Sequence, residues 1–286
     1  MKRIAFVTCA KIPQLTSDDQ LGVEALRRRG IRVDGVCWDD ATVSWKQYDA
    51  VVLRSTWDYH LRPEEFRAWI DRCQHDGIRL WNPGRLVRWN MDKTYLRDLS
   101  AEGVAIPACV WIDRGSDLDL AAALEARDWE RAVLKPTISA SAHQTHVIRR
   151  ENARQVQGML SGIVEKSGAM LQQFMTQVEH PGEWSLTFLG GEFSHGVLKT
   201  PKVGDFRVQI EHGGNVAAAQ PASAFLAQAE QILRAIPEPI LYARVDACEV
   251  DGRLVLMELE LIEPDLFLRT APEAPARFAD AILART

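Results

Sequence analysis

The stretch RVDACEVDGRLVLMELELIEP, residues 244–264, reads as two apolar strands joined by an Asp-Gly turn. Asp246 lies on the first strand, and Glu258 and Glu260 lie on the second. Residues two apart on a strand share a face, so Glu258 and Glu260 are predicted to point the same way. Carboxylates side by side repel, and a divalent cation such as Mg²⁺ would relieve the repulsion because it prefers oxygen ligands. The alternative is a solvated polar face on an edge strand.

Two lysines upstream of this hairpin are candidates for binding phosphate. Lys93 is expected early in a helix, and Lys135 ends the apolar strand AVLKP, directly before the small-residue loop TISASAHQT. A lysine at the end of a buried strand is costly unless its ammonium group meets an anion or a carboxylate. Small residues such as Ser139 and Ser141 allow the backbone to approach a phosphate closely. A phosphate loop is one interpretation, and a lysine paired with a protein carboxylate is the other.

The run AMLQQFM, residues 169–175, ends a predicted strand and precedes a polar turn, as a hinge between two lobes would. An extended hinge can offer one carbonyl and one amide to the edge of an adenine ring. The alternative is an ordinary core strand, because most apolar runs of this length are buried. The hinge interpretation therefore depends on the lysines and carboxylates elsewhere in the chain.

Strands and helices alternate over about the first 82 residues, which predicts a doubly wound parallel sheet. The last third instead shows antiparallel patterns, with strands expected at 184–189, 192–198, 206–210, 244–250 and 254–261. The predicted fold class is therefore α/β (α+β). Three lobes are expected, at residues 1–85, 86–175 and 176–286.

The composition, 47% hydrophobic and 26% charged among 286 residues, is typical of a soluble globular protein. A net charge of −5 argues against a nucleic-acid binder, whose surface would be strongly basic. No stretch approaches the roughly 18 apolar residues of a membrane span, and the short N-terminal apolar run lacks a cleavage site. Five scattered cysteines without a C-x-x-C pair favour the reducing cytoplasm. A homodimer is left open.

The turn after the first strand, TCAKIPQLTS, contains no glycine, so the fingerprint of a nicotinamide-dependent Rossmann enzyme is absent. Ligands of open α/β sheets bind beyond the carboxyl ends of the strands. Cys9 after the first strand, and Arg54, Trp57 and Tyr59 after the third, are therefore predicted to lie near the substrate. An arginine can hold a carboxylate bidentately, and an aromatic ring can wall a small pocket. The alternatives are a buried structural thiol for Cys9 and packing at a lobe interface for the two aromatic residues.

The order of these features resembles that of the ATP-grasp superfamily, in particular the branch of bacterial glutathione synthetase and ribosomal-protein glutamate ligases. The resemblance spans about residues 81–264 and rests on order and spacing more than on identity. It implies that ATP is clamped between two lobes, with phosphate contacts from Lys93 and Lys135 beside the loop that contains Ser139 and Ser141. It also implies a hinge that holds adenine and an acidic residue that holds the ribose. The matching residues are Gln173, Phe174 and Met175 for the hinge and Glu183 for the ribose.

The same resemblance places basic residues at the γ-phosphate and the acyl-phosphate, and these match Lys199 and Arg207. The metal ligands of the superfamily match Asp246, Glu258 and Glu260. The chain departs from the superfamily at two points. The loop after Lys135 is normally glycine-rich, and serine and alanine there lose the freedom to adopt positive φ. The third metal ligand is normally Asn, and a glutamate there makes Mn²⁺ an alternative to Mg²⁺.

The phrases VVLRSTWDYHLRPEEFRAWI (51–70) and ELELIEPDLF (258–267) are similar to a narrower set of ATP-grasp enzymes that includes the cycloserine-forming cyclo-ligase. The resemblance implies an ATP-dependent carboxylate–amine ligase for a small amino-acid-like substrate. The reaction would pass through an acyl-phosphate, release ADP and phosphate, and either join a second amine or close a ring. The alternative is a catalytically inactive or regulatory ATP-binding protein of the same fold.

Overall fold

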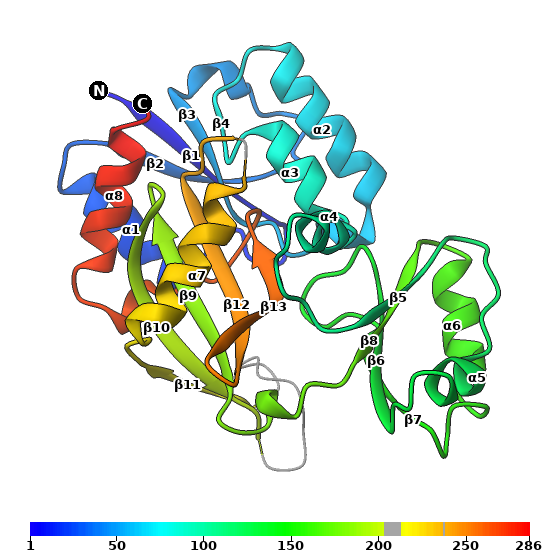
Figure 1. The fold of residues 1–286 in the computed structure, drawn as a ribbon. Helices are drawn as coiled ribbons and strands as arrows, with labels where there is room; N and C mark the ends of the chain where they lie inside the picture. Colours follow the sequence, from blue (N-terminus) through cyan, green and yellow to red (C-terminus); the bar gives the residue numbers. More distant parts are fainter. Residues whose placement is uncertain (203–212, 237) are drawn as a thin grey trace.

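The first sheet of the computed structural model is parallel, with the strand order β2-β1-β3-β4 (Figure 1). The structure describes residues 1–202, 213–236 and 238–286. The elements of this part are β1 (Arg3–Thr8), α1 (Ser17–Arg27), β2 (Arg32–Cys37), η1 (Trp45–Gln47), β3 (Ala50–Ser55), η2 (Tyr59–Leu61), α2 (Pro63–His75) and β4 (Leu80–Trp81). Nearly every residue of β1 and β3 is buried, as expected for parallel strands covered on both faces. The predicted parallel sheet is confirmed.

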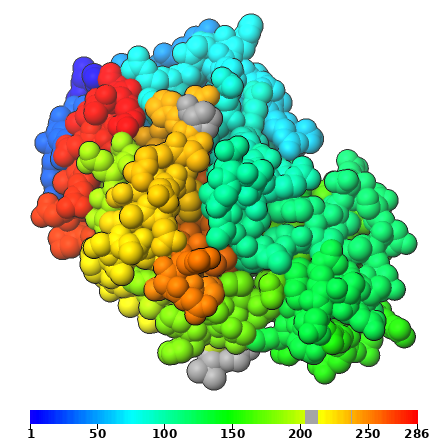
Figure 2. All heavy atoms as spheres, viewed as in Figure 1, coloured from blue at the N-terminus to red at the C-terminus, as the bar shows by residue number. Residues whose placement is uncertain are grey.

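The second sheet is antiparallel, with the strand order β5-β8-β6-β7. Its elements are β5 (Cys109–Ile112), α5 (Leu120–Glu125), β6 (Arg131–Pro136), β7 (His146–Arg149), α6 (Gln157–Val164) and β8 (Ala169–Gln173). Apolar residues of α5 and α6 form one hydrophobic core with the inner face of the sheet. Figure 2 shows this part, in green, protruding from the rest of the molecule.

The third sheet is antiparallel, with the order β11-β10-β9-β12-β13. Its elements are η3 (Thr176–Val178), β9 (Glu183–Leu189), β10 (Glu192–Thr200), β11 (Asn215–Ala218), α7 (Ser223–Arg234), β12 (Tyr242–Val250) and β13 (Arg253–Glu260). Asp251 and Gly252 turn from β12 into β13 with φ of 50° and 75°, as a tight hairpin requires. Strand β11 was not predicted, and the predicted strand 206–210 lies outside the described residues.

The hydrophobic cores cross the lobe boundaries predicted from the sequence. Helices α3 (Gly84–Asn90) and α4 (Tyr95–Ala101) fall in the predicted middle lobe, yet Leu96 packs in the core of the third sheet. The terminal helices η5 (Leu268–Thr270) and α8 (Ala274–Leu283) fall in the predicted last lobe, but α8 lies beside α1 (Figure 1). Phe278 of α8 meets Phe6 of β1, with ring centroids 5.9 Å apart. The exact lobe boundaries therefore stay a prediction. In the described parts of the chain, none of the helices has the length and apolarity needed to cross a bilayer.

Candidate active site

Side chains of the second and third sheets and of the loop after β3 line one cavity of about 260 Å³. The loop after β3, the end of β8 and the facing surface of β9, β10, β12 and β13 each contribute a wall. Most of the predicted site residues are in its lining, namely Trp57, Tyr59, Lys93, Lys135, Ser139, Ser141, Gln173, Phe174, Met175, Glu183, Lys199, Asp246, Glu258 and Glu260. Arg54 and Cys9 do not line the cavity, and Arg207 lies outside the described residues.

The carboxylates of the third sheet face the cavity from adjacent strands. Asp246 lies directly opposite Glu258, and Arg244 lies opposite Glu260. Arg244 donates two hydrogen bonds to Asp246, from Nε to Oδ1 at 2.9 Å and from Nη2 to Oδ2 at 2.8 Å, and also pairs with Glu260. Burial alone would raise the pKa of Asp246, but the charges of Arg244 and Lys199 hold it below its usual range. Burial raises the pKa of Glu260 to about 7 despite the charge of Arg244.

The three predicted metal ligands are not gathered into one ligand group. Within the described residues, no three His, Cys, Asp or Glu side chains are placed so that they could hold a metal ion. The three carboxylates are paired with different cations, Asp246 with Arg244 and Lys199, Glu258 with Lys93, and Glu260 with Arg244. Among the described residues the cavity lining nonetheless contains more carboxylates than cations, and ATP would add further negative charge. The donor chemistry therefore fits a divalent cation, and holding it would require these carboxylates to exchange partners.

The two predicted phosphate-binding lysines differ in their surroundings. Lys93 is buried, donates to the carbonyl oxygen of Ser139 at 2.9 Å and pairs with Glu258 at 2.7 Å. The ammonium group of Lys135 has neither a hydrogen bond nor an ion pair within residues 1–202, 213–236 and 238–286. Burial lowers the pKa of Lys135 despite the opposite charge of Glu258, because the ammonium ion is poorly solvated there. Lys135 is therefore the lysine available to an anionic ligand.

The loop after β6 adopts left-handed backbone conformations without glycine. Ser141, Ala142 and Gln144 have φ of 50°, 54° and 52°. Serine and alanine lack the conformational freedom of the glycines expected in this loop, and they adopt the left-handed region nevertheless. That region costs an L-residue about 1–2 kcal/mol, which the packing around the loop must offset. The small side chains keep the loop backbone close to the cavity.

One backbone amide of the hinge after β8 makes no backbone hydrogen bond within the described residues. The N–H of Gln173 donates to the carbonyl of Ala108 at 2.8 Å, and the N–H of Phe174 donates to Arg131 at 3.3 Å. In the described chain, no backbone carbonyl accepts a hydrogen bond from Met175. The guanidinium of Arg131 also stacks on the ring of Phe174, 3.9 Å from its centroid. The amide of Met175 is the hinge donor that remains for a nucleobase.

Three further residues line the cavity but were missed from the sequence. Gln172 is 2% exposed, and its side-chain Nε2 has no hydrogen-bond partner among the described residues. Arg244 lies two residues before Asp246 on β12. Residues two apart on a strand share a face, so the sequence could have predicted that Arg244 lies beside Asp246. Glu263 follows β13 in an irregular segment, where no periodicity marks it.

Arg54 and Cys9 lie away from the cavity, which corrects the prediction that they contact the substrate. Arg54 is 2% exposed and donates from Nε to Asp19 at 2.8 Å and from Nη2 to the carbonyl oxygen of Pro264 at 2.8 Å. Helix α1 and residues 261–266 thus cover the end of β3, which was expected to open onto the cavity. Cys9 is 1% exposed and packs in the hydrophobic core of the first sheet.

Trp57 and Tyr59 combine the two roles considered for them. Both line the cavity, as predicted for substrate residues. Trp57 also donates from Nε1 to the carbonyl oxygen of Glu263 at 3.0 Å, and Tyr59 is 4% exposed and packs on Phe66. The same side chains therefore wall the cavity and join the first sheet to the segment after β13.

Replacing Arg54 with Ala is expected to lower the free energy of unfolding by about 3–5 kcal/mol, because Asp19 would keep a buried charge without its cation. Urea unfolding measures this change. Arg62→Ala is the matched control, since Arg62 makes ion pairs with its side chain 36% exposed and should cost at most about 1 kcal/mol. Unchanged stability in Arg54→Ala would contradict this structural assignment.

Comparison with known proteins relates the chain to one set of proteins along its whole length. Residues 4–82 match the family described as "D-cycloserine synthetase DcsG, N-terminal domain". Over 301 residues the chain is 33% identical to the cycloserine biosynthesis protein DcsG of Streptomyces lavendulae, with 99% of this chain and 98% of that protein covered.

Solved structures agree with this relationship. The crystal structure of D-cycloserine synthetase DcsG matches with a TM-score of 0.87 at 30% identity and covers 99% of both chains. A RimK-domain ATP-grasp protein from Sphaerobacter thermophilus matches with a TM-score of 0.72 at 16% identity, over 98% of this chain and 99% of that one. The second likeness, at this low identity, shows the fold alone.

Proposed function

Because the chain belongs to the D-cycloserine synthetase family of ATP-grasp ligases, we propose that it uses ATP to close a small amino-acid-like substrate into a ring. The observation that carries the proposal is the shared cavity, where lysines and the hinge of the second sheet face carboxylates of the third sheet. The cavity therefore brings cationic groups, a hinge amide and carboxylates to one place, as the binding of a nucleotide and a small acid would require. Similarity to the cycloserine proteins over the whole chain supports the same reaction.

ATP would lie between the second and third sheets, with its phosphates at Lys135. A phosphate would offset the cost of burying that ammonium group, which has no partner in the described chain. The amide of Met175 and the carbonyl of Gln173 would hold the adenine edge. The assignment of Glu183 to the ribose requires a partner exchange, because Lys199 now pairs with its carboxylate at 2.5 Å.

The substrate carboxylate would attack the γ-phosphorus of ATP, giving an acyl-phosphate and ADP. An amine of the same molecule would then attack the acyl carbon, expel phosphate and lose a proton. Lys199 and Arg244, and Arg207 by resemblance, would balance the negative charge that develops on the transferred group. The carboxylates Asp246, Glu258 and Glu260 would hold Mg²⁺ or Mn²⁺. When bound, the cation would neutralise negative charge on the phosphate oxygens.

The product named for the relatives suggests the substrate. The ring of D-cycloserine contains a carbonyl carbon bonded to nitrogen, and opening that bond by hydrolysis gives O-amino-D-serine. An ATP-dependent ring closure of this kind would therefore act on O-amino-D-serine. The acid is small and amino-acid-like, as the sequence led us to expect.

The purified protein is expected to release phosphate from ATP when O-amino-D-serine is added, and to form D-cycloserine in equal amount. D-Serine is the control substrate, because it lacks the nitrogen that closes the ring. EDTA should stop the reaction and added Mg²⁺ should restore it, since the phosphate charge would otherwise be unbalanced. Phosphate release coupled to the joining of two amino acids would indicate an intermolecular ligase. ATP binding without phosphate release across a panel of amino acids would instead favour a non-catalytic protein.

A further inference from the structure

The segment after β13, residues 261–266, is held by side chains along its whole backbone. Each of its carbonyl oxygens accepts a side-chain hydrogen bond at 2.7–3.0 Å. In order from residue 261 to residue 266, the donors are Asn82, Tyr242, Trp57, Arg54, Arg244 and His195. The donors come from both the first and the third sheet regions, so the segment is fixed before any ligand binds. Fixation of this kind is what a preorganised binding residue needs.

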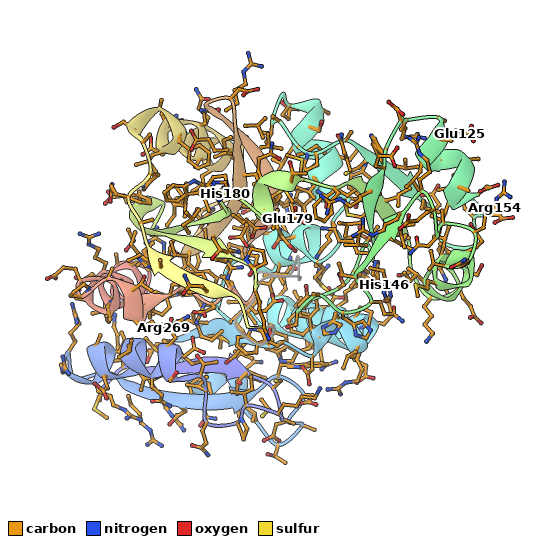
Figure 3. All side chains as sticks on the ribbon, turned by 90° about the horizontal axis from the view of Figure 1, so that it is seen from below. Glu125, His146, Arg154, Glu179, His180 and Arg269 are labelled. Carbon is orange, nitrogen blue, oxygen red and sulfur yellow. The ribbon has the colours of Figure 1, made fainter. Side chains whose placement is uncertain are left out.

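Glu263 is the residue of this segment whose carboxyl group is left for a ligand. It lines the cavity, and within the described residues no hydrogen bond or ion pair reaches its side chain. The other carboxylates of the cavity are already paired. Glu183, Asp246, Glu258 and Glu260 each meet a lysine or arginine of the cavity, and Asp265 meets Arg269, which is labelled in Figure 3.

The surroundings of Glu263 favour a cationic ligand. Burial raises its pKa well above the usual range, and the neighbouring charge of Glu260 raises it further. A carboxylate in such a place is costly until a cation joins it. The aromatic residues Trp57, Tyr59 and Phe267 line the same cavity, and aromatic faces attract an ammonium group.

We propose that Glu263 binds the α-ammonium group of the substrate and thereby selects α-amino acids over acids that lack this group. The inference rests on the proposed function, in which the carboxylate of the same substrate is phosphorylated in this cavity. An α-amino acid has its ammonium group one carbon away from its carboxylate, so both groups fit within one small site. Arg54 and Trp57 are positioning residues in this scheme, because they hold the backbone of residues 264 and 263.

The variant Glu263→Gln keeps the shape of the side chain and removes its charge. Its KM for O-amino-D-serine is expected to rise about tenfold to hundredfold, the scale of one hydrogen bond to a charged group. Its KM for ATP and its melting temperature should stay unchanged. The second probe is 3-(aminooxy)propanoate, the same acid without the α-amino group. The unaltered protein should prefer O-amino-D-serine, and Glu263→Gln should no longer distinguish the two acids.

Glu273→Gln, at an exposed position before α8, is the matched control and should keep both KM values. An unchanged KM for O-amino-D-serine in Glu263→Gln would overturn the proposal. A lower kcat at unchanged KM would also overturn it, since that result assigns the carboxyl group to proton transfer. A joint loss of ATP affinity and melting temperature would assign it to structure alone.

A failure of the proposed function is recognised separately, because the unaltered protein would then release no phosphate with either acid. Calorimetry would in that case test Glu263 by itself, with D-cycloserine and isoxazolidin-3-one, which lacks the amino group. Tighter binding of D-cycloserine by the unaltered protein, lost in Glu263→Gln, supports the inference. Equal affinity for the two rings would overturn it.

Discussion

Replacing Glu258 with Gln is expected to lower Mg²⁺-dependent turnover by about 10²-fold or more, the scale of one strong electrostatic stabiliser. Glutamine keeps the size of the side chain but removes one negative charge from the cavity wall. Asp246 lies directly opposite residue 258 on the neighbouring strand. The remaining carboxylates would hold a divalent cation less tightly. The initial rate of phosphate release, measured over a series of Mg²⁺ concentrations, should therefore show a higher half-saturating concentration.

Glu249→Gln is the matched control for this experiment. Glu249 lies on β12, the strand of Asp246, but is half-buried outside the cavity lining, so its loss should leave turnover normal. Asp246→Asn provides a second test of the same wall. Normal turnover in both Glu258→Gln and Asp246→Asn would exclude the metal site. A fall in turnover without any change in the Mg²⁺ dependence would trace the effect to Lys93, which pairs with Glu258.

Replacing Lys135 with Met is expected to weaken ATP binding by about 10²-fold, because the ammonium group would lose a charge-assisted bond to phosphate. The variant should be at least as stable as the unaltered protein without ATP, since it removes a poorly compensated charge. Burial lowers the pKa of Lys135 on folding. In the pH range between that lowered pKa and the ordinary lysine value, the unfolded chain binds more protons. The unaltered protein should therefore gain stability as pH rises through that range, and Lys135→Met should not.

Calorimetry with ATP and urea unfolding at several pH values would measure these two effects. Lys166→Met is the control, because Lys166 is exposed after α6 and away from the cavity. Unchanged ATP affinity together with unchanged turnover in Lys135→Met would remove Lys135 from the nucleotide site. Weaker binding together with a loss of stability would instead indicate that Lys135 supports the fold.

Local periodicity accounts for what the sequence determined by itself. A period of two placed Glu258 and Glu260 on one strand face, and the structure puts both in the cavity lining. Lys135 was predicted as a site residue because it ends an apolar strand, and it also lines the cavity. The alternation of strands and helices over the first 82 residues predicted the parallel sheet. Each of these inferences depends on residues that are close together in the chain, so the pattern is readable without the fold.

The tertiary structure alone decided which groups are covered and which are paired. Arg54 ends an apolar strand in the way a ligand-binding residue would, but Asp19 and Pro264 take its hydrogen bonds. Conversely, Glu263 follows a strand without any pattern, and donors from two sheet regions fix its backbone beside the cavity. Pro264 is 210 residues away from Arg54 in the chain. Contacts between residues far apart in the chain decide which side chains are buried and which are paired. Such contacts produce no periodic pattern in the local sequence.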